Sequence, residues 1–121
     1  KLASIVVPTD VLNNLTQGLE ILPALPDNEF YQITRGYIRL NGAAADSGKK
    51  VNIETSGEGH ALSSIKATFF NTPDNVGYLD EEAHLEVDIH FGEALILKAS
   101  SAMTFIDTTL TINLVYRIIR L

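Results

Sequence analysis

The chain has 121 residues, enough for one domain, and it contains no cysteine and no tryptophan. The missing cysteine excludes a disulfide framework and thiolate-based metal or nucleophile sites. Nine Lys and Arg against fifteen Asp and Glu give a net charge of −6, which disfavours nucleic acid as a partner. No run approaches the roughly 18–20 apolar residues of a membrane-spanning helix. We therefore expect a single domain, residues 1–121, with neither nucleic acid nor a membrane as partner.

Two short strands are expected near the N-terminus, at 4–7 and 19–22. The first ends at Pro8 and the second at Pro23, and proline is confined to strand ends and sheet edges. Both strands are therefore predicted at an edge or an end of a sheet. Helix is scarce, and a single turn is expected at 11–15.

A long strand follows at 30–40, and its apolar residues change phase part-way along. Tyr31 and Ile33 belong to one face, whereas Ile38 belongs to the opposite face, with Gly36 between them. One extra residue in a strand shifts its side chains to the other face in this way. The pattern predicts a β-bulge at the glycine.

The remaining strands are expected at 51–55, 65–70, 84–91, 94–99 and 109–119. Both faces of 109–119 are apolar toward its end, which predicts a central strand or an oligomer contact. Turn-forming Gly, Pro, Asp and Asn separate the strands. Seven to eight strands at this spacing predict an all-β fold, an antiparallel β-sandwich that is jelly-roll-like.

One predicted strand face carries four side chains of types that bind metal ions, His84, Glu86, Asp88 and His90. The alternative is the water-facing side of an antiparallel strand, where charged residues are usual. The two histidines are not in the His-x-His arrangement that suits a strand metal site. We therefore favour the solvent-facing interpretation and expect no cofactor.

Acidic residues are concentrated in a stretch without Lys or Arg: Asp74, Asp80, Glu81, Glu82, Glu86, Asp88 and Glu93. The Asp-x-Asp-x-Asp-Gly pattern of a calcium loop is absent. We favour a solvated loop, and a patch that docks a basic partner is the functional alternative.

Catalytic motifs are weak. His60 lies near Ser56, Ser63 and Ser64 in the sequence, but no Gly-x-Ser-x-Gly elbow is present. A small sandwich with short turns also leaves little room for a substrate cleft. We expect no enzymatic activity.

Carbohydrate binding is an alternative on grounds of fold. Sugars usually stack on exposed aromatic rings, and Tyr78, Tyr31 and Tyr37 are the candidate platforms. A carbohydrate- or metal-binding module is therefore the second functional hypothesis.

Two stretches carry a family resemblance. The first is Leu19-Glu20-Ile21-Leu22-Pro23-Ala24-Leu25-Pro26, which precedes the long strand predicted at 30–40. The second consists of residues 92–99 and the strand predicted at 109–119, which begins Thr109-Leu110-Thr111-Ile112. In this order they resemble the small β-sandwich virion proteins of tailed bacteriophages, including capsid decoration, head-fibre and tail-associated modules. The resemblance implies a non-enzymatic structural protein in the virion that assembles on itself and docks on the major capsid protein or other particle proteins.

Two segments, 67–70 and 115–121, hold more apolar residues than one sheet face requires. We expect them to form subunit interfaces in a homo-oligomer, with a trimer as the favoured form. The interface candidates are Phe69, Phe70, Val115, Ile119 and Leu121.

Overall fold

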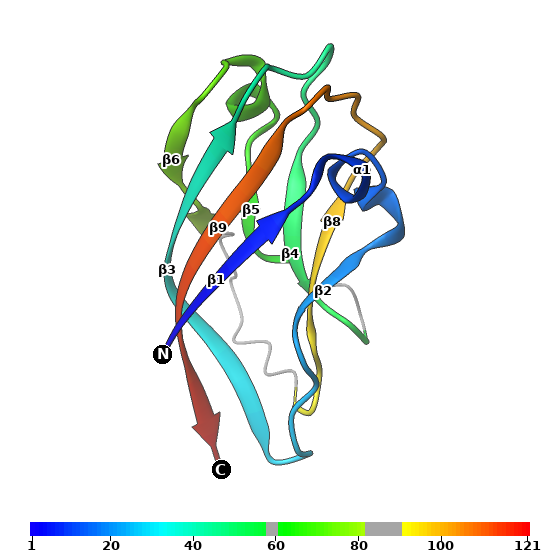
Figure 1. Cartoon of the computed structure of the whole chain (residues 1–121). Coiled ribbons are helices and arrows are strands. Elements are labelled where there is room, and N and C mark those ends of the chain that lie inside the picture. The colour runs from blue at the N-terminus through cyan, green and yellow to red at the C-terminus, as the bar shows by residue number, and fades with distance from the viewer. Residues whose placement is uncertain (58–60, 82–90) are drawn as a thin grey trace.

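The computed structural model describes residues 1–57, 61–81 and 91–121 as two packed antiparallel sheets (Figure 1). The four-stranded sheet has the order β1 (Leu2–Val7), β9 (Thr109–Arg120), β3 (Glu29–Asn41) and β6 (Val76–Tyr78). The five-stranded sheet has the order β2 (Leu19–Leu22), β8 (Leu95–Ala99), β4 (Val51–Thr55), β5 (Ala61–Ile65) and β7 (Asp80–Glu81).

The strand pairing is that of a jelly roll. β1 pairs with β9, β2 with β8, β3 with β6 and β4 with β5, so the chain is a folded antiparallel ribbon whose successive pairs fall in alternate sheets. The two-residue β7 adds to one edge of the second sheet. The predicted all-β, jelly-roll-like sandwich is confirmed, with eight strands in its two main layers.

One apolar core lies between the sheets. The four-stranded sheet contributes Ile38, Leu40, Leu110, Ile112 and Leu114, and the five-stranded sheet contributes Val51, Ile53, Ile65, Leu95 and Leu97, all buried. The short helix α1 (Thr9–Leu12) and the 3-10 turn η1 (Leu15–Gln17) add buried Leu12 and Leu15. No helix among the described residues is long and apolar enough to cross a membrane.

Most predicted strands are confirmed. Those expected at 4–7, 19–22, 30–40, 51–55, 94–99 and 109–119 correspond to β1, β2, β3, β4, β8 and β9. β1 and β2 are sheet edges as expected, and β9 is central, between β1 and β3. The strand expected at 84–91 lies outside the described residues except for Phe91, which is in a turn.

The strand expected at 65–70 is wrong. β5 ends at Ile65, and the 3-10 turn η2 (Ala67–Asn71) follows it. Its adjacent residues Phe69 and Phe70 are both buried, whereas successive side chains of a strand would point to opposite faces. The Phe69 N–H donates to the Lys66 carbonyl at 3.0 Å, which closes the turn.

Three described strands, β5, β6 and the two-residue β7, are not among the predicted ones, and β5 and β6 lack the expected alternation of apolar and polar residues. In β5 the inward-facing residues include Ser63, which is buried opposite Ile53. In β6 the exposed residues are Val76 and Tyr78, and the residue between them is Gly77, which lies over the Phe69 ring.

Candidate functional site

A β-bulge in β3 determines which side chains the four-stranded sheet exposes. Ile33 lies opposite Tyr116 and Arg35 opposite Val115, so Thr34 is the extra residue of the bulge. Its hydroxyl donates to the Val115 carbonyl at 2.9 Å. Beyond the bulge Arg35, Tyr37 and Arg39 point outward, whereas an unbroken strand would turn them toward the core. The predicted change of phase is confirmed, and the bulge lies two residues before Gly36.

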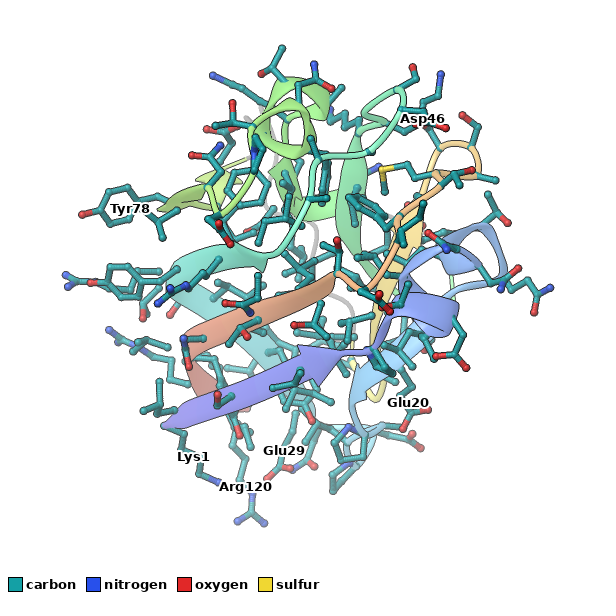
Figure 2. All side chains as sticks on the ribbon, turned by 45° about the horizontal axis from the view of Figure 1, so that its top comes forward. Lys1, Glu20, Glu29, Asp46, Tyr78 and Arg120 are labelled. Atoms are coloured by element: carbon teal, nitrogen blue, oxygen red, sulfur yellow. The ribbon has the colours of Figure 1, made fainter. Side chains whose placement is uncertain are left out.

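These side chains combine with those of β6 in a surface that we call the Tyr–Arg face, consisting of Arg35, Tyr37, Arg39, Val76 and Tyr78. Tyr37 lies opposite Tyr78 and Arg39 opposite Val76. The two tyrosine rings are 5.2 Å apart at an angle of 53°, and Tyr78 is 72% exposed. Figure 2 shows Tyr78 projecting away from the ribbon.

The Tyr–Arg face continues across β9 onto β1. Tyr37 lies opposite Asn113, which in turn lies opposite Ser4, and Arg39 is linked through Thr111 to Val6 in the same way. The outer side of the sheet therefore runs from two tyrosines, across small polar side chains, to exposed apolar residues on the edge strand.

The charge of this sheet contrasts with the acidity of the chain. All four arginines lie on β3 and β9, and Glu29, at one end of β3, is the only acidic residue in the sheet's four strands. No arginine makes an ion pair with a described residue, although Arg35 Nη1 donates to the Tyr37 hydroxyl at 3.0 Å. The Tyr–Arg face is therefore locally basic, with guanidinium groups available to a carboxylate.

Local contacts hold β6 beside β3. The Leu79 N–H donates to the Gly36 carbonyl at 2.9 Å, and the Leu79 side chain occupies the space where a Cβ of residue 36 would lie. At the other end, the Asp74 N–H donates to the Gly42 carbonyl at 3.0 Å, and Asp74 Oδ1 accepts from the Gly42 N–H at 2.9 Å. Glycine at 36 is therefore required by the close approach of Leu79.

The three predicted aromatic platforms separate into two environments. Tyr37 and Tyr78 are exposed together, whereas Tyr31 is buried between the sheets. The Tyr31 hydroxyl donates to the Pro23 carbonyl at 2.5 Å, and its ring meets Tyr116 edge-on at 5.7 Å. Burial, followed by the influence of Tyr116, Glu20 and Glu29, raises the pKa of Tyr31 above 10.0. Tyr31 is thus a structural residue and no ligand platform.

The interface candidates also differ in position. Phe70 is fully buried against Phe69 and Phe105, so the core accounts for the two phenylalanines of 67–70 and leaves neither ring exposed to a partner. Val115 is half-buried on the outer side of the sheet, between Leu2 and Arg35. Ile119 is half-buried opposite Phe30, and the Leu121 side chain is exposed.

The metal candidates His84, Glu86, Asp88 and His90 lie outside the described residues, as does His60. Within the described part of the chain no group of three or more His, Asp or Glu side chains is arranged to hold a metal ion. Ser63 and Ser64 are buried in β5, and the Ser56 hydroxyl accepts a hydrogen bond from the Ala94 N–H.

Described members of the acidic stretch have contacts within the chain. Asp74 caps the turn at Gly42, Glu93 accepts from the Gly57 N–H, and Asp80 lies 3.9 Å from Lys66. Glu82, Glu86 and Asp88 lie outside the described residues. The structure therefore gives Asp74, Asp80 and Glu93 local roles, and it does not place the stretch as one patch.

The five-stranded sheet has a hollow of about 420 Å³ at one end, bordered by Gln17, Gly18, Glu54, Ile96 and Lys98. The described residues of its walls carry one carboxylate and one ammonium group and include no aromatic side chain. The hollow offers neither a stacking surface nor a pair of carboxylates.

A search of protein-family models, curated proteins and solved structures finds no match to the chain. Proposals about function therefore rest on the geometry and composition described above.

Proposed function

We propose that the chain is a non-enzymatic structural protein of a bacteriophage virion, a capsid decoration or auxiliary protein or a fibre-base protein, that self-associates and docks on other particle proteins. Jelly rolls are frequent in viral capsid domains and also occur in lectins, so the fold is compatible with the role without selecting it. The sequence resemblance supports the same role.

The observation that carries the proposal is the Tyr–Arg face. Tyrosine and arginine dominate the energetics of protein interfaces, because they combine a large contact area with directed hydrogen bonds. Here Tyr37 and Tyr78 are exposed on a sheet that also presents Arg35 and Arg39. Because the arginines make no ion pair with a described residue, we infer that the docking partner, the major capsid protein or another virion protein, presents an acidic surface.

The direct experiment is to purify assembled capsids and tails on a density gradient and to quantify the chain on them by mass spectrometry. We expect the chain on the particles. We expect Arg35→Glu/Arg39→Glu to reduce its occupancy about 30-fold, as loss of roughly 2 kcal/mol at interface arginines implies. Absence of the wild-type chain from purified particles would exclude this function.

A matched variant separates docking from net charge. Lys66→Glu/Lys98→Glu makes the same change in charge outside the Tyr–Arg face, and both side chains are exposed. We expect its occupancy to stay close to that of the wild type. Equal loss in the two double variants would show that the Tyr–Arg face has no special part in docking.

Carbohydrate binding is a second candidate function, favoured specifically by the exposed pair Tyr37 and Tyr78. Stacking of a neutral sugar depends little on salt, whereas docking of arginines on an acidic protein weakens as salt rises. Saturable tyrosine fluorescence changes with a neutral oligosaccharide, abolished in Tyr78→Ala and insensitive to salt, would favour the sugar.

A further inference from the structure

Among the described residues four strands lie at sheet edges, and they are protected to different degrees. β6 has three residues and the described part of β7 has two, and short edge strands limit pairing with another chain. β2 contains Glu20, has an irregular register between Glu20 and Leu22, and ends at Pro23. β1, in contrast, spans six residues, has an uninterrupted register with β9 and contains neither charge nor proline. β1 therefore lacks the usual features that prevent edge pairing.

The hydrogen bonds to β9 identify the free backbone groups of β1. Lys1 and Tyr116 exchange two hydrogen bonds, of 2.7 and 2.9 Å, and form a hydrogen-bonded pair. In an antiparallel ladder such pairs alternate, so Ala3, Ile5 and Val7 also bond to β9. The N–H and C=O groups of Leu2, Ser4 and Val6 point away from β9, toward the free edge.

These three residues form a self-complementary series. Paired with itself antiparallel about Ser4, β1 places Leu2 opposite the partner's Val6 and Ser4 opposite the partner's Ser4. Each of these pairs exchanges two N–H···O bonds. Leu2 is 69% exposed and Val6 61% exposed, so the pairing covers apolar side chains and brings no two charges together.

We propose that two copies of the chain pair through β1, about a two-fold axis at Ser4, into one continuous eight-stranded sheet. Such a pair is isologous and closes at two copies, unlike the trimer expected from sequence. This pairing gives a geometry for the self-association in the proposed function. The pairing itself does not depend on the chain being a virion protein.

The pairing also has a consequence for docking, and this part rests on the proposed function. A two-fold axis perpendicular to the sheet keeps the outer sides of both copies on one surface. The two Tyr–Arg faces of the pair then lie on the same side, and a partner with repeated acidic sites binds both at once. Two linked contacts give a higher avidity than one.

The test measures mass by sedimentation at roughly 10 µM to 1 mM, a range in which a weak pair shifts from one chain to two. The wild type is expected to approach twice 13.2 kDa. Val6→Lys, which places a charge on the exposed outer side of the edge, is expected to raise the dissociation constant about tenfold or more. Val76→Lys makes the same change at a 65% exposed position on β6 and is expected to retain the pair.

Hydrogen exchange followed by NMR gives a signature specific to the edge. In the pair the amides of Leu2, Ser4 and Val6 become protected as concentration rises, whereas those of Ala3 and Ile5 are protected throughout. A wild-type mass of one chain or of three at 1 mM, or equal effects of Val6→Lys and Val76→Lys, would overturn the proposal. A stable pair that is absent from particles would exclude the virion function and leave the edge pairing intact.

Discussion

The two sheets contribute to one core but expose different chemistry to solvent. The strands of the five-stranded sheet expose Glu20 and Lys98 and half-bury Asn52, Glu54 and Asp80, together with the half-buried apolar side chains of Leu19, Ile21, Leu62 and Ile96. The strands of the four-stranded sheet expose five large hydrophobic or aromatic residues, Leu2, Val6, Tyr37, Val76 and Tyr78. Among the described strands of the other sheet none of this kind is exposed. Packing in the core therefore accounts for the apolar side chains on the inner faces of both sheets. It does not account for the apolar and aromatic side chains on the outer face of the four-stranded sheet.

If the two sheets share one core, removal of a buried core side chain should destabilise the whole domain. This is the largest effect that we expect. Phe70 is fully buried, 5.3 Å from the Phe69 ring and 5.8 Å from the Phe105 ring. We expect Phe70→Ala to lower the free energy of unfolding by about 3–5 kcal/mol in urea denaturation. Val76→Ala, at an exposed position, is the control and should change it by about 0.5 kcal/mol or less. A small effect at Phe70 would show that the stability of the two sheets does not depend on this buried ring.

The next largest effect concerns the crossing between the two sheets, where Leu79 connects β6 to β7. Because the Leu79 side chain fills the place of a Cβ at residue 36, Gly36→Ala should cost about 1–3 kcal/mol of stability. A double-mutant cycle with Leu79→Ala, measured by denaturation, should show a smaller combined loss than the sum of the single losses. Strict additivity would contradict the described contact.

A smaller effect depends on pH. The raised pKa of Tyr31 means that the folded state favours the neutral phenol, so its contribution is complete below pH 10.0 and is lost as pH rises through the folded pKa. Tyr31→Phe should cost about 1 kcal/mol at neutral pH, since the hydrogen bond to Pro23 is lost. It should also reduce the alkaline fall in stability, measured by thermal unfolding between roughly pH 8 and 12. If stability falls equally with alkaline pH in Tyr31→Phe and the wild type, titratable groups other than Tyr31 cause the fall.

Much of the fold could be predicted because inward-facing apolar residues repeat every second position, as in β3, β4 and β9. The predicted change of phase in β3 is also confirmed, although it was not used to place Arg35 and Arg39 on the outer side. The strand at 65–70 was wrong because Ile65, Ala67 and Phe69 alternate while Phe70 is also drawn into the core. β6 was missed because its two large side chains face solvent, so no burial pattern marks it.

The candidate site was harder to predict than the fold. Tyr37 and Tyr78 are far apart in the sequence, and only the pairing of β3 with β6 brings their rings together. The acidic stretch drew attention because its seven carboxylates lie between residues 74 and 93 without an intervening Lys or Arg, whereas the four arginines are divided between two distant strands. A signal was present, because three of the four arginines lie in the strands predicted at 30–40 and 109–119, but whether they share a surface depends on strand order.

The most direct test of the Tyr–Arg face is modification of the four tyrosines by a nitrating reagent, read by mass spectrometry on the free chain and on the chain bound to particles. In the free chain Tyr37 and Tyr78 should react, and Tyr31, which is 8% exposed, should not. Docking through the Tyr–Arg face predicts that Tyr37 and Tyr78 become protected on the particle. Equal reactivity of these two tyrosines in the free and bound chain would contradict the central claim.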